Sequence, residues 1–292
     1  MTLLLFLLSA VTAHATVGWA GPMNRYVLQA VNEMPTSGGR YSTAFTGMEA
    51  AMENGDGTSL PRAAGAKLNR SGFCSACTFA VFLTALNLAQ KQLRLTVSPA
   101  MATGLQFTHQ VDGDGWWGSW NANGPGTAVF MQETRIGANF TVSRDPAEMM
   151  TELKPGDFLK ISWNGKVGAE ESGHSVVVLE TKSGKDLLKL HPEGVAAWDR
   201  PSKSLVMAPV DPLDAYVKTW SCNMPDAMSV RWVPLKKIPF GIASRLYDPA
   251  KVFAALNETR FTGSNYLRSL LKVRSSPGEA QRASGISPVL DR

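Results

Sequence analysis

The sequence predicts an α+β protein in which one long, buried helix packs on an antiparallel sheet. The segment 74–92 has almost no helix-breaking residue and is apolar on most sides, as a central helix is. Beyond residue 155, short Val-rich and aromatic segments alternate with Gly and Pro turns, which favours strands. The helices precede the strands along the chain, and this order is typical of α+β proteins.

Five segments have helical character. Residues 23–34 carry apolar side chains at helical spacing, and "PTSGGRYS" ends that pattern. Residues 145–153 form a short helix with Asp145 as N-cap and Pro146 at the first helical position. The other three expected helices span residues 74–92, 248–257 and 264–273.

The strand candidates follow one another in the second half of the chain. The segment "LKPGDFLKISW" predicts a turn and then a strand, and "GHSVVVLET" predicts a second, buried strand. Further candidates are "DLLKLH" (186–191), "YVKTWSCN" (216–223) and "SVRWVPLKKI" (229–238). Consecutive strands with short connections predict an antiparallel sheet.

Composition narrows the class of protein. The chain has 292 residues, of which 44% are hydrophobic and 18% charged, so it can bury a large core. The formal net charge of +5 favours an anionic partner such as a cell wall. No run of Lys and Arg is dense enough to predict nucleic-acid binding.

The N-terminus predicts export. "MTLLLFLLSAVTAHA" joins an apolar run to small residues that end in the A-x-A form of a signal-peptide cleavage site, with cleavage after Ala15. The segment has no Lys or Arg, and the alternative is a buried N-terminal helix. The apolar run is too short for a stable membrane span, so we expect a secreted or periplasmic protein.

Cys74 and Cys77 open the predicted long helix, and several chemistries fit this Cys-x-x-Cys pair. A helix N-terminus lowers a thiol pKa, as redox pairs require, but the polar "GAKLNRSGF" replaces the strand that precedes a thioredoxin-like motif. A zinc site needs four ligands, and Cys222 is the only further cysteine. Both thiols can also be small buried residues.

A nucleophilic thiol needs an imidazole nearby to hold it as thiolate and to pass a proton to the leaving group. Of the four histidines, His174 stands directly ahead of a buried strand, which would hold it rigidly at the end of the sheet. The alternative for His174 is a polar turn residue. Together with Cys74 it predicts a catalytic pair.

"FCSACTFAVFL", "LKPGDFLKISW" and "GHSVVVLE", in this order, resemble the NlpC-type papain-like cysteine peptidases and amidases. The resemblance covers about residues 71–233 in pattern rather than in long identical runs. It implies a papain-like fold and an enzyme that cleaves an amide bond, as most members do in peptidoglycan. It identifies Cys74 with the nucleophile and His174 with the base, without a cofactor.

The family also places a polar residue on the next strand to orient the imidazole. Asn223 is the preferred candidate if residues 195–212 are an insertion, while His191 and Ser221 are the alternatives. The amide N–H of Cys74 could donate to an oxyanion. If Cys222 packs near the long helix, a Cys77–Cys222 disulfide is possible and leaves Cys74 as the free thiol.

A Gly- and Trp-rich loop at 112–128 is the expected substrate-binding wall, with Trp116, Trp117, Trp120 and Gly124 as its residues. The alternative is a loop folded on its own aromatic side chains. The "DGDG" within it lacks the later ligands of a calcium loop, so we expect no metal.

The organisation expected from these observations is a signal peptide, an N-terminal segment, a papain-like catalytic domain, C-terminal helices and a disordered tail. Their bounds are 1–15, 16–70, 71–247, 248–274 and 275–292. The expected function is that of an exported cysteine hydrolase acting through a thioester on peptidoglycan or another peptide. A non-catalytic cell-wall-binding module on the same scaffold and an exported thiol-disulfide protein are the alternatives.

Overall fold

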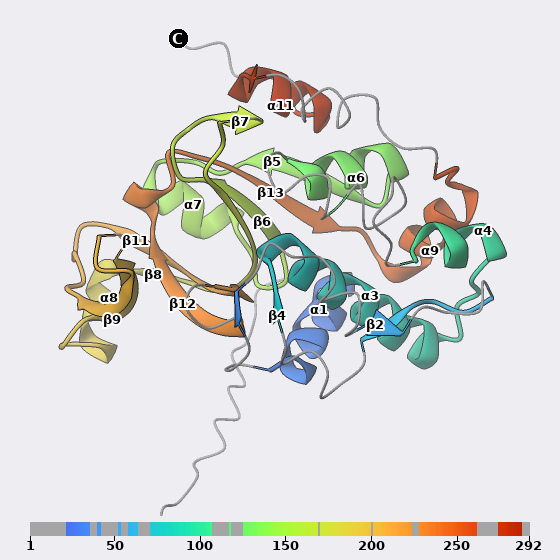
Figure 1. Cartoon of the computed structure of the whole chain (residues 1–292), viewed down its shortest axis with the longest axis horizontal. Helices are drawn as coiled ribbons and strands as arrows, with labels where there is room; N and C mark the ends of the chain where they lie inside the picture. The colour runs from blue at the N-terminus through green and yellow to red at the C-terminus, as the bar shows by residue number, and fades with distance from the viewer. Residues whose placement is uncertain are drawn as a thin grey trace, which may run out of the picture.

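A long helix lies against the face of a six-stranded sheet in the computed structural model of the chain (Figure 1). The structure describes residues 22–35, 40–41, 52–53, 58–63, 71–106, 117, 125–168, 170–199, 201–223, 228–261 and 274–287. The expected signal peptide at 1–15 and the expected helix at 264–273 lie outside these ranges.

The helices largely follow the predicted segments. The described helices are α1 (Pro22–Glu33), α3 (Cys74–Leu93), α4 (Pro99–Gly104), α6 (Gly126–Thr134), α7 (Pro146–Glu152), α8 (Gly184–Leu190), α9 (Pro249–Glu258), α11 (Pro277–Ala283) and the 3-10 helix η3 (Leu235–Lys237). Asp145 caps α7 as predicted, because its side chain accepts from the N–H groups of Ala147 and Glu148. None of the described helices is both long and apolar enough to cross a bilayer.

The strands form one main sheet and four small pairs. The strands of the main sheet, in spatial order, are β12 (Met228–Pro234), β11 (Ala215–Cys222), β8 (Gly173–Ser183), β6 (Phe158–Ser162), β13 (Phe240–Leu246) and β5 (Gly137–Thr141). The pairs are β1 (Arg40–Tyr41) with β4 (Ser71–Gly72), β2 (Met52–Glu53) with β3 (Arg62–Ala63), β9 (Val195–Asp199) with β10 (Ser204–Ala208), and β7 (Val167–Gly168) with β14 (Arg274–Ser275). Every pairing in the main sheet is antiparallel, which confirms the predicted α+β class.

Successive side chains of each strand point to opposite faces of the sheet, and each face packs in its own hydrophobic core. Phe158 and Val177 join α1, α3 and α6 in the larger core, whereas Leu159 and Val176 join α7 in the smaller one. Helix α3 is buried along most of its length, from Cys74 to Ala89 with few interruptions. This burial fixes where the first turn of α3 meets the sheet.

Several segments differ from their predicted state. The expected loop at 112–128 ends early, because α6 begins at Gly126, and the predicted strand at 229–238 ends at Pro234, just before η3 begins. "DLLKLH" forms helix α8 rather than a strand, because the Ser183 side chain accepts from the Asp186 N–H at 3.1 Å and nucleates the turn. The tail from 275 was expected to be disordered, but Pro277–Ala283 form α11. A capping box of Ser276 and Glu279 begins that helix, and Ala280 is buried against the larger core.

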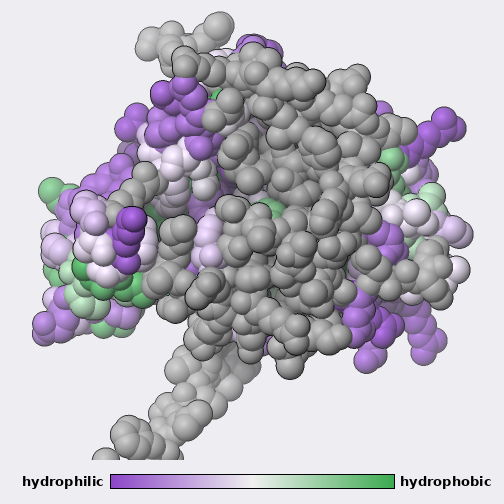
Figure 2. Space-filling model, in the orientation of Figure 1, coloured by the Kyte–Doolittle hydropathy of each residue, from purple (hydrophilic) through white to green (hydrophobic). Residues whose placement is uncertain are grey.

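Strands β9 and β10 form a hairpin outside the main sheet, as expected if residues 195–212 are an insertion between β8 and β11. A small hydrophobic core attaches this hairpin and α8 to the main sheet. Its buried side chains are Leu187, Val195, Val210 and Tyr216. Figure 2 shows hydrophobic residues on the surface at this side of the molecule. The exposed apolar side chains here are Leu190, Leu205, Val206, Met207 and Leu213.

The "PGD" turn holds three parts of the fold together. Asp157 is fully buried, and Arg245 of β13 donates to both of its oxygens at 2.8 and 2.7 Å. Asn24 of α1 donates to the same carboxylate at 3.0 Å. Gly156 has a φ of +88°, and a Cβ there would lie 2.8 Å from the backbone oxygen of Asn24. The turn therefore requires glycine, and its aspartate joins the sheet to α1.

We expect Asp157→Ala to destabilise the fold by about 3 kcal/mol, because it removes the buried carboxylate that pairs with Arg245 and accepts from Asn24 and from the Lys154 N–H. Urea denaturation followed by circular dichroism measures this loss. Asp186→Asn is the matched control, since it disrupts the exposed Lys189–Asp186 pair, which solvent screens, and should cost much less than Asp157→Ala. Equal losses in the two variants would show that Asp157 does not hold the fold together.

Candidate active site

Cys74 is the first residue of α3 and the one free cysteine among the described residues. The N-cap residue, Phe73, has extended backbone (φ −120°, ψ 163°) and an apolar side chain that cannot accept from the first helical N–H groups. The positive end of the helix macrodipole is therefore directed at the thiol. The thiol is buried, with only 3% of the residue exposed.

The environment of Cys74 favours the thiolate. Burial is the largest single effect and raises its pKa, but the charge of His174 and a hydrogen bond with it act in the opposite direction. Lys160 and a backbone hydrogen bond from Ser175 also lower the pKa, and these effects together outweigh burial, so the pKa falls to about 6. The Cys74 thiol is thus largely ionised near neutral pH.

His174 and Asn223 meet at the end of the β8–β11 pair. The register of these strands pairs Val177 with Trp220, and continuing it by three residues along each strand places His174 opposite Asn223. His174 Nε2 lies 2.7 Å from Asn223 Oδ1. The structure therefore brings together Cys74, His174 and Asn223, which the sequence singled out.

The orientation of the Asn223 amide sets the roles of the imidazole nitrogens. Asn223 Nδ2 donates to the backbone oxygens of Ser221 and Ser229 at 3.0 and 3.2 Å. Its Oδ1 consequently faces His174, where an amide oxygen can only accept. His174 Nε2 carries the proton of that hydrogen bond, and Nδ1 is the ring nitrogen left for Cys74.

The other two candidates for the third residue do not contact the imidazole. Ser221 is buried, and its Oγ donates to the backbone oxygen of Ser175 at 2.5 Å. His191 follows α8 on the surface, where its ring meets the edge of Trp232 at 6.5 Å between centroids. His191 is therefore ruled out as the orienting residue, and Ser221 supports the Ser175 peptide instead.

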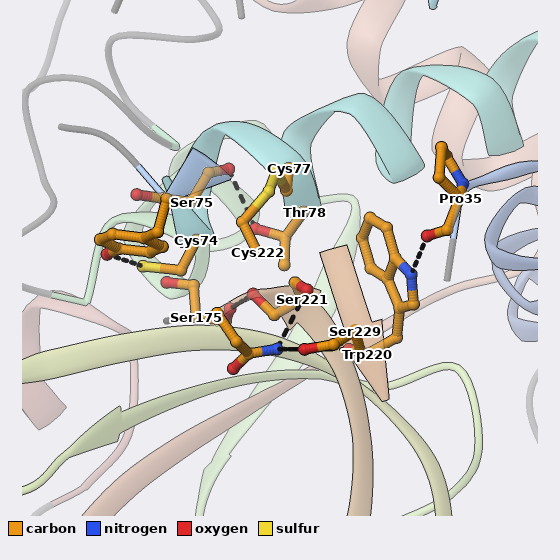
Figure 3. The surroundings of a disulfide bond; sticks show 12 residues. Pro35, Cys74, Ser75, Cys77, Thr78, Ser175, Trp220, Ser221, Cys222 and Ser229 are labelled. Atoms are coloured by element: carbon orange, nitrogen blue, oxygen red, sulfur yellow. Dashed lines mark hydrogen bonds between the residues drawn. A yellow bond between two sulfur atoms is a disulfide. The ribbon is translucent and has the colours of Figure 1, made fainter. Parts of the chain in front are cut away.

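A Cys77–Cys222 disulfide joins α3 to the end of β11 (Figure 3). Cys77 lies one turn into the helix after Cys74, and Cys222 directly precedes Asn223. The bridge thus joins the helix that carries the nucleophile to the strand end that carries Asn223. Because Cys77 is bonded to Cys222, the Cys-x-x-Cys motif is not a redox pair in this structure.

Two aromatic side chains of the site were not predicted from the sequence. The Tyr41 hydroxyl donates to Cys74 Sγ at 3.9 Å, and burial and the charge of Cys74 raise the pKa of Tyr41 far above its ordinary value. Trp163 stacks on the His174 ring at 6.3 Å between centroids. The sequence shows Tyr41 only within a Gly-rich break, and no periodic pattern marks such a position.

A buried ion pair lies on and next to β6, the strand that pairs with β8. Lys160 Nζ is 2.8 Å from Glu171 Oε1, and both side chains are almost fully buried. Lys160 stands opposite Ser175 in the β6–β8 register, on the strand next to the residue whose backbone contacts Cys74. A small pocket between β6, β13 and the start of α6 adjoins this pair.

The expected Trp-rich wall is only partly described. Trp116, Trp120 and Gly124 lie outside the described residues. Trp117 is 1% exposed, packs among Phe82, Phe130 and Phe158, and donates through Nε1 to Thr78 at 3.1 Å. Trp117 is thus a core residue rather than a substrate contact, because its whole ring is enclosed by α3, α6 and β6.

Comparison of the chain with protein-family models, curated proteins and solved structures finds no match. Within the described ranges, no group of three or more His, Cys, Asp or Glu side chains could hold a metal ion.

We expect the Cys74 thiolate to titrate with a midpoint near pH 6, so that it predominates above this pH and is lost below it. His174→Ala should raise the midpoint by about two units or more, because it removes the largest of the effects that lower the pKa of Cys74, while burial still raises it. Ultraviolet absorbance of the thiolate and iodoacetamide alkylation rates measure the midpoint. His191→Ala is the matched control and should leave it unchanged, and equal midpoints in both variants would contradict the pairing.

The disulfide predicts a labelling pattern and a stability effect. Alkylation of the denatured, unreduced protein should modify Cys74 alone, and reduction should expose Cys77 and Cys222 as well. Replacing both bridged cysteines by serine should cost about 2–4 kcal/mol of unfolding free energy. Peptide mapping by mass spectrometry and urea denaturation measure the two effects, and recovery of Cys74 in a bridged peptide would contradict the assignment.

Proposed function

We propose that the protein is an exported papain-like cysteine hydrolase that cleaves an amide or peptide bond, with peptidoglycan as its substrate. One observation carries the proposal. A thiol with a lowered pKa begins a buried helix and interacts with an imidazole whose far nitrogen is held by an amide. Acyl-transfer enzymes with a thiol nucleophile need this set of groups in this order.

The first half of the reaction forms a thioester. The Cys74 thiolate attacks the carbonyl carbon, a C–S bond forms, and the carbonyl π electrons move onto oxygen. The first N–H groups of α3 and the Tyr41 hydroxyl, which donates to the sulfur at 3.9 Å, are the donors that stabilise this oxyanion. Imidazolium His174 then gives its Nδ1 proton to the departing nitrogen as the C–N bond breaks.

The second half releases the acid. His174 Nδ1 takes a proton from water as its oxygen attacks the thioester carbon, and collapse of the tetrahedral intermediate breaks the C–S bond. The product leaves as a carboxylic acid, and Cys74 returns to the thiolate. Asn223 accepts from Nε2 throughout, so the ring keeps one orientation while Nδ1 gains and loses its proton.

The substrate class rests on sequence features. The resemblance to cell-wall peptidases and amidases and the net charge of +5 support an anionic cell-wall polymer. The predicted signal peptide supports export, and disulfides such as Cys77–Cys222 form in oxidising compartments. A non-catalytic cell-wall-binding module on the same scaffold would not need a low-pKa thiol with an oriented imidazole.

Incubation of purified peptidoglycan with the protein should release soluble fragments that mass spectrometry identifies by their new amine and carboxyl ends. Cys74→Ala should lower the rate at least about a thousandfold, because the nucleophile is lost. Ser202→Ala, in the exposed turn between β9 and β10, is the control and should match the unmodified protein.

The negative outcomes separate the parts of the proposal. If peptidoglycan stays intact while a peptide library is cleaved in a Cys74-dependent way, the cell-wall substrate is wrong. If no amide is cleaved but the protein sediments with peptidoglycan, the binding module replaces the hydrolase.

A further inference from the structure

Asn223 must present the correct atom to His174. A side-chain amide can be rotated by half a turn with little change in shape, and that rotation would replace Oδ1 by Nδ2 opposite His174 Nε2. Two donors would then face each other whenever Nε2 is protonated. The site therefore depends on groups that distinguish the two ends of the Asn223 amide.

The backbone oxygens of Ser221 and Ser229 can only accept, so they distinguish the two ends of the amide, and a hydroxyl adds a third acceptor beside Nδ2. That hydroxyl belongs to Ser229 of β12. It stands directly opposite Ser221 in the β11–β12 pair, next to the point where Asn223 leaves β11. Asn223 Nδ2 donates to Ser229 Oγ at 3.0 Å, to the Ser229 backbone oxygen at 3.2 Å and to the Ser221 backbone oxygen at 3.0 Å. The hydroxyl and backbone of Ser229 thus provide two of the three acceptors around Nδ2.

Rotation of the amide would be costly here. It would place Oδ1 beside two carbonyl oxygens, which cannot donate, and Asn223 is only 6% exposed, so water would not compensate easily. The Ser229 hydroxyl contacts Asn223 from β12, whereas His174 contacts it from β8 on the other side of β11. Its described hydrogen bonds go to Asn223 rather than to Cys74 or His174.

We propose that Ser229 is a positioning residue of the thiol site: it fixes the Asn223 amide with Oδ1 toward His174 Nε2, so that Nδ1 is presented to Cys74. The inference rests on the proposed function in taking Cys74 and His174 as the catalytic pair. Ser229 acts through Asn223 and touches neither reacting group. A hydroxyl on β12 thereby extends the site from two strands to three.

The other groups around Cys74 allow this effect to be isolated. His174 of β8, Lys160 of β6 with its partner Glu171, and Tyr41 of β1 are the titratable groups that act on or contact the thiol. Ser229 and Asn223 are uncharged, so replacing the Ser229 hydroxyl acts on the thiol through the position of His174 rather than through an added or removed charge. The pH profile of the Cys74 thiolate is thus a readout that a merely structural serine would not move.

The test compares Cys74 titrations by thiolate absorbance and alkylation rate in Ser229→Ala, Asn223→Ala, the double variant and the Ser202→Ala control. Ser229→Ala should raise the midpoint by roughly half a unit to one unit, the effect of one hydrogen bond. Asn223→Ala should raise it further, and adding Ser229→Ala to it should change nothing more, since the two residues act in series.

A second pair of variants keeps the test independent of folding defects. Ser229→Thr retains the hydroxyl and Ser229→Val replaces it by a methyl group at nearly the same volume. Thr should titrate like the unmodified protein and Val like Ser229→Ala. Equal midpoints for Thr and Val, an additive effect of Ser229→Ala on Asn223→Ala, or a Ser229→Ala midpoint equal to the Ser202→Ala control would each overturn the proposal.

The outcome also separates this inference from the proposed hydrolase. The titrations need no substrate, so a shifted midpoint with no amide cleavage supports Ser229 as a positioning residue while the hydrolase fails. Cys74-dependent cleavage with an unshifted Ser229→Ala midpoint overturns the role of Ser229 and leaves the hydrolase in place.

Discussion

The packing of α3 against the sheet is the constraint on which the site depends. Its buried side chains contact β8 and β11 on the face of the larger core, so the helix cannot slide along its axis without opening cavities. Its first residue is consequently held beside the beginning of β8, where His174 and Ser175 lie. The Cys77–Cys222 disulfide adds a covalent bond between the same two parts.

The buried thiolate makes the electrostatics of this arrangement demanding. An ionised sulfur in the interior is unfavourable unless opposite charge and hydrogen bonds surround it. His174 supplies the main compensation, and the backbone of Ser175 and the more distant Lys160 add to it. Glu171 in turn pairs with Lys160, so the strand next to His174 carries no unpaired buried cation. The site thereby lowers the pKa of one thiol within a dry interior.

Hydrogen bonds across three strands give the site its rigidity. Ser221 of β11 binds the backbone of Ser175 in β8, and Asn223 binds His174 while Ser229 of β12 binds Asn223. Each of these groups is held by the pairing register of its strand, which moves only if the sheet itself rearranges. The imidazole is therefore oriented by the sheet rather than by a mobile loop.

Local patterns determined much of this protein. The periodicity of 74–92, the Asp145 cap and the Val-rich segment after His174 each specify an element from neighbours in sequence, and the structure has α3, α7 and β8 there. Local signals failed where a competing local or tertiary interaction decided the outcome. A serine cap turned 186–190 into helix α8, and a capping box with a buried alanine ordered α11.

Local patterns did not determine which residues form the site, because these residues come from distant parts of the chain. Residue chemistry singled out Cys74 and His174, but three candidates remained for the group that holds the imidazole. The β8–β11 register decided in favour of Asn223, and the burial of Trp117 moved it from the expected substrate wall into the core. Tyr41, Trp163 and Ser229 carry no sequence signal for their roles. Only the pairing of strands and the packing of α3, which act between residues far apart in sequence, place them beside the thiol and its partners.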